Sequence, residues 1–352
     1  MKPLIANIEK NEVINSYNLA RRCDIVFSEV ISQKNFKLLD LKNYTIINQD
    51  QGKIFYKLNN LSIKENDVIF CNTFMISSLF KLLKYVDLKN IKLVTHQTDL
   101  SITKDTFNQK PECISEWYSI NVDYDHKNLF SLPIGLSNEY SPKNLFQKNY
   151  KDSEFIDFEK KVKKGYANFQ INTNNKVREA TQRKLIKSDW VVFDEPNLEI
   201  DEYLSQLIKY KYILAPFGNG IDTHRIWESL YAGSIPVVQK HINFASYSDL
   251  PICFIDDFGT TDIEFLEDFS KNIVLDNFNS NKLKVTFWEE AIKAKNIEQN
   301  KNLFQLQETA KDEKYFINEY LRKERNKSRL KRIYYNFRRV RNRIKKLLSL
   351  LN

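Results

Sequence analysis

Short apolar runs rich in β-branched and aromatic residues recur along the first half of the chain, separated by polar stretches. They have the length of strands and lie at 24–30, 67–73, 91–97 and 129–135. In residues 74–86 the apolar positions instead recur every three or four residues, which predicts a helix. A helix between two such strands is a β-α-β pattern, which favours parallel strands.

The second half of the chain shows the same alternation more clearly. We expect strands at 166–172, 189–195, 211–217, 234–239 and 251–256, and helices at 175–188, 199–210 and 223–233. The segments 172–176 and 222–223 hold Asn, Asp and Thr residues where helix N-caps are expected. Strands that alternate with helices of this length predict a parallel sheet covered on both faces.

The length of the chain favours more than one domain, because 352 residues exceed what one hydrophobic core usually serves. The polar segment 142–164 is the best candidate for a linker. We therefore predict an α/β protein with two Rossmann-like domains, at 1–150 and 151–300, and a tail at 301–352. In such sheets ligands bind beyond the carboxyl ends of the strands.

Cysteine spacing and hydropathy narrow the class of protein further. The four cysteines are scattered without CxxC spacing, which argues against a zinc ribbon or a disulfide scaffold: Cys23, Cys71, Cys113 and Cys253. No segment has the roughly 18 to 20 uncharged apolar residues of a membrane-spanning helix, and the N-terminal apolar run is too short for a secretory signal. We expect a cytoplasmic protein with reduced thiols.

The net charge of +9 comes from the end of the chain. Residues 325–352 hold eleven Lys or Arg and no acidic residue, so the remainder carries −2, the difference between +9 and +11. Nine apolar residues there have helical spacing: Leu330, Ile333, Tyr334, Phe337, Val340, Ile344, Leu347, Leu348 and Leu351. This pattern predicts a basic amphipathic helix on an anionic membrane surface. The same pattern also fits three alternatives: an RNA-binding segment, a coiled segment, or a helix packed on its own protein.

One loop concentrates the features of a ligand site. Gly218 and Gly220 follow an expected strand, in a chain with only seven glycines, and the helix after them carries Arg225 and Glu228. Glycine lets backbone approach a ligand, and a helix N-terminus and an Arg fork both suit a diphosphate. Glu228, one turn further on, suits the ribose hydroxyls. The alternative is a tight turn with an ordinary Arg225–Glu228 surface salt bridge.

The same loop and helix resemble the nucleotide-sugar motif of exostosin-like glycosyltransferases. The matching positions are Pro216, Gly218, Gly220, Arg225, Glu228, Leu230, Gly233, Ile235, Pro236 and Val237. The resemblance is strongest over 165–255, and a weaker one extends over 94–101 and 117–140. It departs from the family at His224 and at Ser234, where Cys is common. The resemblance implies a GT-B architecture, with the sugar nucleotide on the C-terminal domain and the acceptor on the N-terminal domain.

Roles follow from this resemblance residue by residue. Arg225 would bind the donor phosphates, Glu228 the ribose, and Asn219 with Gly218 and Gly220 the phosphates or sugar. His224 adjoins Arg225 and would touch the donor. Asn172, Thr173 and Asn174 stand at a helix start that caps a phosphate in such folds, or they form a plain N-cap.

Transfer to an acceptor hydroxyl also requires a base. His96 and Asp99 follow an expected strand in the acceptor domain and are the candidates, although a loop histidine and a turn-capping Asp99 fit equally. His126 is more typical of a turn. The acidic pairs at 123–125 and 256–257 lack the setting of a metal-binding DxD motif. We therefore expect metal-independent transfer without a cofactor.

The combined prediction is a glycosyltransferase in surface polysaccharide synthesis. It would use a nucleotide sugar and a glycan or lipid-linked acceptor, and its tail would hold it peripherally on the inner face of the cell membrane. A nucleic-acid-binding protein is the first alternative, but the −2 charge outside the tail does not favour it. A non-catalytic glycan-binding or scaffold protein is the second, although Arg225 and Glu228 are both present.

Overall fold

The computed structural model describes residues 5, 8–50, 52–141, 144–151, 153–272, 278–294 and 304–307. Up to Leu306 these residues belong to one compact unit. The predicted tail helix and its membrane-facing stripe lie outside the described residues.

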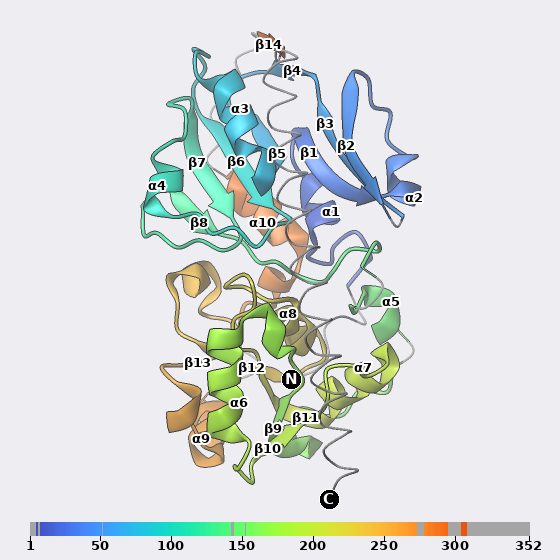
Figure 1. The fold of residues 1–352 in the computed structure, drawn as a ribbon, viewed down its shortest axis with the longest axis vertical. Helices are drawn as coiled ribbons and strands as arrows, with labels where there is room; N and C mark the ends of the chain where they lie inside the picture. Colours follow the sequence, from blue (N-terminus) through green and yellow to red (C-terminus); the bar gives the residue numbers. More distant parts are fainter. Residues whose placement is uncertain are drawn as a thin grey trace, which may run out of the picture. The chain divides into compact units, whose positions relative to one another are not determined.

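The first half of the chain forms a seven-stranded sheet, in the order β2-β3-β1-β5-β6-β7-β8 (Figure 1). The strands are β1 (Ile25–Ser32), β2 (Tyr44–Asp50), β3 (Lys53–Leu58), β5 (Val68–Asn72), β6 (Ile91–His96), β7 (Ile114–Ser119) and β8 (Leu129–Ser131). Strands β1, β5, β6, β7 and β8 run parallel, whereas β3 is antiparallel to both of its neighbours. The four predicted strands correspond to β1, β5, β6 and β8.

Three strands of this sheet were not predicted, because their residues do not form continuous apolar runs. β2 lies at the edge and is half polar, and β3 and β7 contain Lys or Glu between apolar residues. The short elements around the sheet are α1 (Ser16–Ala20), α2 (Gln33–Phe36), α3 (Ile76–Leu83), α4 (Lys104–Phe107), and β4 (Asn60–Ile63), which pairs with β14 (Phe304–Gln307).

The second half forms a five-stranded, wholly parallel sheet in the order β10-β9-β11-β12-β13. Its strands are β9 (Val162–Ala167), β10 (Val191–Phe193), β11 (Tyr210–Leu214), β12 (Ile235–Gln239) and β13 (Cys253–Ile255), and all five overlap predicted strands. The first strand, β9, lies between the second and the third. The order therefore reverses between β9 and β11, which is where doubly wound sheets place a ligand crevice.

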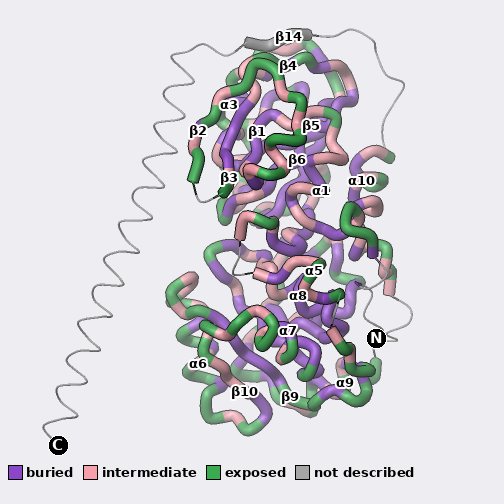
Figure 2. The backbone as a smooth tube through the Cα atoms, turned by 90° about the vertical axis from the view of Figure 1, so that its right-hand side faces the viewer, coloured by how far each residue is buried: buried purple, intermediate pink, exposed green. Residues whose placement is uncertain are grey.

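Helices connect these parallel strands. They are α6 (Ala180–Leu185), α7 (Ile200–Lys209) and α8 (His224–Tyr231), and a π-helical turn at Asn175–Glu179 precedes α6. Helix α9 (Ile263–Asn272) follows the last strand. Figure 2 shows the buried residues concentrated along the strands and the exposed ones along the outer faces of α6 and α7. The predicted mixed α/β class is confirmed.

The two halves share packing. Helix α10 (Val285–Lys293) returns to the first half, where the Val285 amide donates to the Glu12 carbonyl at 2.8 Å. One cluster of buried apolar residues includes Val68 and Phe70 of the first sheet together with Trp227 and Tyr247 of the second half. The segment 142–164 contains α5 (Gln147–Tyr150) and three buried apolar side chains, Leu145, Tyr150 and Phe158, so its described part packs on the protein.

Candidate functional site

The glycine loop between β11 and α8 is shaped by close contacts with two side chains. A Cβ atom on Gly220 would lie 2.8 Å from the Asn121 amide, and one on Gly218 would lie 3.0 Å from Nη2 of Arg178. The Gly218 amide donates to the Gly220 carbonyl at 3.0 Å and closes the turn. Both positions therefore favour glycine, because the side chains of Asn121 and Arg178 lie close to where a Cβ atom would be. From the sequence alone, the glycines were expected to make room for a ligand.

A cavity of about 680 Å³ opens beside this loop, and we call it the arginine cavity. It lies beyond the carboxyl ends of β9, β10 and β11, at the point where the strand order reverses. Its lining includes eight of the eleven predicted site residues: Asp99, Thr173, Gly218, Asn219, Gly220, His224, Arg225 and Glu228. Asn172, Asn174 and His96 are not part of the lining.

Two guanidinium groups face this cavity. Arg225, in the first turn of α8, donates from Nη2 to the Asn168 carbonyl, and its Nε is buried without a hydrogen-bond partner. Arg178 is 6% exposed. It donates to the carbonyls of Phe217 (2.9 Å), Gln170 (3.0 Å) and Pro216 (3.3 Å). Backbone carbonyls thus hold both groups in fixed positions.

Electrostatics make this pair unusual. Burial, and secondarily the charge of Arg225, lowers the pKa of Arg178 to about 9. Among the residues that the structure describes, neither guanidinium forms an ion pair with a carboxylate. Two guanidinium groups without a direct carboxylate partner thus converge on one cavity, whose lining also includes Asp99, Glu199, Asp222 and Glu228. Their unpaired hydrogen-bond donors are suited to an anion.

Glu228 has a tyrosine as its partner. The carboxylate is 4% exposed, and its Oε2 accepts a hydrogen bond from the Tyr203 hydroxyl at 2.9 Å. The Arg225 guanidinium lies 5.9 Å from the centre of the Tyr203 ring. The alternative of an Arg225–Glu228 surface salt bridge is absent from the described part of the chain. Tyr203 therefore connects the two predicted donor-binding residues.

Two candidate proton acceptors lie beside the cavity. His224 forms a hydrogen bond of 2.8 Å from Nδ1 to the Gly135 carbonyl. Because a carbonyl only accepts, Nδ1 carries the proton and Nε2 of a neutral ring keeps its lone pair. Asp99 is exposed at the cavity surface. The sequence predicted Asp99 as a base but assigned His224 to donor binding.

His96, the other predicted base, lies elsewhere. It is 3% exposed, and its Nδ1 accepts a hydrogen bond from the Gln97 amide at 2.8 Å. Burial lowers the pKa of His96 to about 3, with a smaller effect from the neighbouring His224. The ring is therefore neutral near pH 7 and is packed inside the first half rather than on the cavity surface.

Two roles were predicted for residues 172–174, contact with a donor phosphate and a plain N-cap, and the structure separates these residues. Asn174 acts as an N-cap, accepting from the Val177 amide at 3.2 Å, and its Nδ2 donates to the Gly218 carbonyl at 2.9 Å. Thr173 lines the cavity, and Asn172 is exposed outside it. Asn174 thus supports the glycine loop from behind.

A buried polar network behind the glycine loop joins the two halves. Oδ2 of Asp222 accepts from the Ile134 amide at 2.9 Å and from the Tyr247 hydroxyl at 3.1 Å. The side chain of Asn121 accepts from the amides of Ile221 (2.9 Å) and Asp222 (3.0 Å). Burial raises the pKa of Asp222 to about 6. Asp222 and Thr223 were predicted where an N-cap belongs, and Thr223 is the N-cap residue of α8. Asp222 instead accepts from Trp227 of that helix at 3.0 Å and from the two distant segments.

The remaining acidic pairs have ordinary partners. Asp257 forms an ion pair with Lys184 at 2.6 Å and Asp256 one with Lys240 at 3.0 Å, while Asp123 lies 3.4 Å from His241. Over the described residues, no group of three or more His, Cys, Asp or Glu side chains is arranged to hold a metal ion. Metal-independent transfer stays a prediction.

Arg178 and Tyr203 are the main residues that sequence reasoning missed. Arg178 lies in a predicted helix and shares a face with Thr181 and Leu185, all three of them buried. A charged residue on the apolar face of a helix was the available signal. The sequence held no such signal for Tyr203, because an aromatic residue at helical spacing is typical of a hydrophobic core.

Comparison with protein-family models gave no match, and comparison with curated proteins found no significantly similar sequence. The resemblance to exostosin-like glycosyltransferases therefore stays a prediction. No helix among the described residues combines the length and apolar character needed to cross a membrane.

Proposed function

We propose that this protein is a glycosyltransferase that takes a sugar from a nucleoside diphosphate sugar. The observation that carries the proposal is the pair of guanidinium groups in the arginine cavity, Arg178 and Arg225, which form no ion pair among the described residues. Its place at the strand-order reversal supports the same conclusion, because doubly wound sheets bind nucleotides there. A GT-B arrangement of the two sheets belongs to this proposal.

A diphosphate suits the cavity electrostatically. The pKa of Arg178, lowered to about 9, still leaves it protonated at pH 7 beside the charge of Arg225. A ligand with two negative charges would relieve this repulsion, and the amides of His224 and Arg225 at the start of α8 would add hydrogen-bond donors. The same groups stabilise the negative charge that develops on the departing diphosphate.

Glu228 and Tyr203 would orient the nucleoside. The Tyr203 hydroxyl occupies Oε2 of Glu228, which leaves Oε1 to accept a hydrogen bond from a ribose hydroxyl. The residues after β10, from Pro196 to Ile200, line the same cavity and extend it past Tyr203. This part of the cavity leaves space for the nucleobase of the donor, on the side away from the glycine loop.

The transfer step needs one proton acceptor. The base removes the proton of an acceptor hydroxyl, the oxygen bonds to the anomeric carbon, and the bond from that carbon to the phosphate oxygen breaks with its electrons on the diphosphate. Of the two groups beside the cavity, we assign His224 this role, since its Nδ1–H bond to Gly135 leaves Nε2 as the acceptor. Asp99 is the competing assignment.

A donor screen tests the proposal. Thermal shift and hydrolysis are measured with UDP-, GDP-, TDP- and CMP-sugars for the wild type, Arg225→Ala and Arg183→Ala. Arg183 is a matched control, because its exposed side chain pairs with Glu179 at 2.8 Å outside the cavity. We expect one diphosphate sugar to stabilise the wild type and the control, and Arg225→Ala to lose this response. The CMP-sugar, a monophosphate, should have the weakest effect. Equal responses in all three proteins would refute the proposal.

Attachment to the inner membrane face through residues 325–352, and with it a lipid-linked acceptor, belongs to the same proposal. The support is the sequence pattern of eleven basic residues against an apolar stripe. Anionic liposomes should sediment the full chain at low salt but not a chain truncated after Lys323. Sedimentation of both chains alike would contradict this part.

A further inference from the structure

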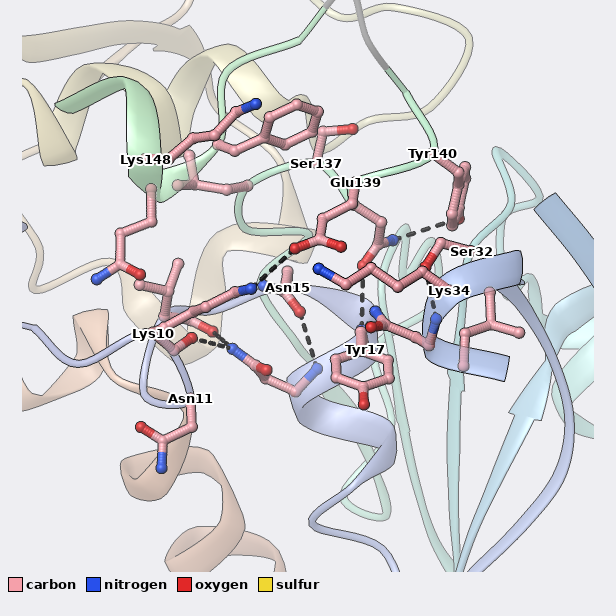
Figure 3. Close-up of a pocket in the computed structure, with 18 of the residues that line it drawn as sticks. Lys10, Asn11, Asn15, Tyr17, Ser32, Lys34, Ser137, Glu139, Tyr140 and Lys148 are labelled. Carbon is pink, nitrogen blue, oxygen red and sulfur yellow. Dashed lines mark hydrogen bonds and ion pairs between the residues drawn. The ribbon is translucent and has the colours of Figure 1, made fainter. Parts of the chain in front are cut away.

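A second and larger cavity, of about 970 Å³, lies in the first half of the molecule, and we call it the lysine cavity. Three segments form it: residues 9–18 around α1, residues 30–35 at the end of β1 and the start of α2, and residues 136–140 together with 146–151 around α5. Figure 3 shows Lys10 and Lys34 directed toward Glu139, whereas Asn11 points away from them. No predicted site residue belongs to it.

Lysine charges dominate this cavity. Its lining holds Lys10, Lys34, Lys148 and Lys151 against Glu9 and Glu139, a surplus of two positive charges. Lys10 forms an ion pair with Glu139 at 2.8 Å, and Lys34 and Lys148 also act on that carboxylate. Together they lower the pKa of Glu139. One carboxylate among three ammonium groups leaves charge available for a second anion.

The rest of the lining is chiefly amide and hydroxyl groups. The polar residues are Asn11, Asn15, Asn18, Ser32, Asn35, Ser137, Asn138 and Gln147, and Tyr17 and Tyr140 add aromatic rings. Amides and hydroxyls hydrogen-bond to sugar hydroxyls, and aromatic faces cover apolar sugar faces. The volume lies within the roughly 300–1,000 Å³ of small-ligand sites, which suits an oligosaccharide end better than a folded partner.

We infer that the lysine cavity binds an acidic saccharide, with Lys34 and Lys148 contacting its carboxylate or phosphate group. The positive surplus selects the anion, and the amides, hydroxyls and tyrosines bind the rings. Lysine is a compact point charge on a flexible stem, so the cavity does not impose the bidentate geometry of the arginine cavity.

This saccharide is the acceptor of the transfer, a step that rests on the proposed function. The two cavities share a wall. Ile134 and Asn144 line the arginine cavity, whereas Leu136 and Ser137 line the lysine cavity. Nδ2 of Asn144 donates across this wall to the Ser137 hydroxyl at 3.1 Å. The two cavities therefore adjoin at this hydrogen bond, and a saccharide that extends past it from the lysine cavity would reach the proposed donor site.

Calorimetric titration of the full chain without donor tests the site. The probes are trigalacturonate, neutral maltotriose and inorganic phosphate. The variants are the double change Lys34→Gln with Lys148→Gln, and a charge-matched control, Lys187→Gln with Lys271→Gln, at exposed positions outside the cavity. We expect trigalacturonate to bind the wild type and the control within about twofold, and the cavity variant at least tenfold more weakly. Arginine at both cavity positions should restore binding.

The other probes set the limits of the inference. Maltotriose should bind at least tenfold more weakly than trigalacturonate, and phosphate should not displace the saccharide at equal concentration. Equal binding of trigalacturonate to the wild type and the glutamine variant would overturn the inference, as would displacement by phosphate alone. Arg225→Ala should bind trigalacturonate normally, so a failure of the proposed donor site leaves this test intact. In a transfer assay the glutamine variant should raise the acceptor KM and leave the donor KM unchanged.

Discussion

The arginine cavity and the lysine cavity both present cationic side chains, but they hold them differently. In the arginine cavity the guanidinium groups are partly or wholly buried and tied to backbone carbonyls. In the lysine cavity all four lysines are exposed, and Lys10 is 77% exposed at its side chain. Buried, fixed donors suit one ligand geometry, whereas exposed lysines adapt to several. Under the proposed function, this difference predicts one fixed donor in the arginine cavity and a more variable ligand in the lysine cavity.

The largest expected effect concerns the base, which only the arginine cavity supplies. His224→Ala should lower kcat by about 10²- to 10⁴-fold, the usual contribution of a positioned base, while donor affinity changes little. The measurement is single-turnover transfer with donor binding determined separately. Asp99→Asn should keep kcat within about threefold. If kcat falls in Asp99→Asn and not in His224→Ala, Asp99 and not His224 is the base.

The next largest effect is expected when arginine and lysine are exchanged, which tests how far each cavity depends on the geometry of its cationic group. Arg225→Lys should weaken donor binding more than tenfold, because lysine lacks the planar fork and a charge-assisted hydrogen bond contributes about 1.5–3 kcal/mol. Lys34→Arg should leave saccharide binding within about twofold. Titration of each ligand into each variant checks both. If both exchanges are tolerated, the two cavities recognise charge alone.

A third prediction concerns stability against pH and the buried His96. Its pKa falls from 6.5 to about 3 on burial, so its contribution to stability is complete above pH 6.5 and is lost as the pH falls toward 3. The loss is roughly 1.4 kcal/mol per pH unit below about 6.5. His96→Asn, which keeps an acceptor for the Gln97 amide, should remove this slope in urea unfolding between pH 5 and 7.

Asp222 serves as an internal reference in that experiment. Its pKa is raised to about 6, so its stabilising contribution is present at low pH and is lost as the pH rises through 6. This slope has the opposite sign and remains in both proteins, so it cancels in their difference. Identical slopes for wild type and His96→Asn would mean that His96 titrates normally.

The smallest expected effect concerns the partner of Glu228. Tyr203→Phe removes one hydrogen bond to the carboxylate, which contributes about 1 kcal/mol, and should weaken donor binding about three- to tenfold. Binding of free pyrophosphate should stay unchanged, because Arg178 and Arg225 remain. Equal weakening of both ligands would mean that Tyr203 supports the guanidinium groups rather than the nucleoside.

The sequence predicted the strands and helices that position the arginine cavity, because buried parallel strands are apolar runs with a local signal. It missed β2, β3 and β7, where half-polar strands depend on neighbours for burial. It placed His96 beside the ligand because it follows a strand of the acceptor half. The structure buries it, since the direction of one side chain depends on packing against distant residues.

By itself the sequence determined the α/β class, the loop with Gly218 and Gly220, and the helix that carries Arg225 and Glu228. All of these follow from local spacing and backbone preference. Tertiary structure decided that Arg178 joins Arg225 at one cavity, that Tyr203 contacts Glu228, and that residues from three segments form the lysine cavity. These neighbours are far apart in the chain, and only the order of the strands brings them together.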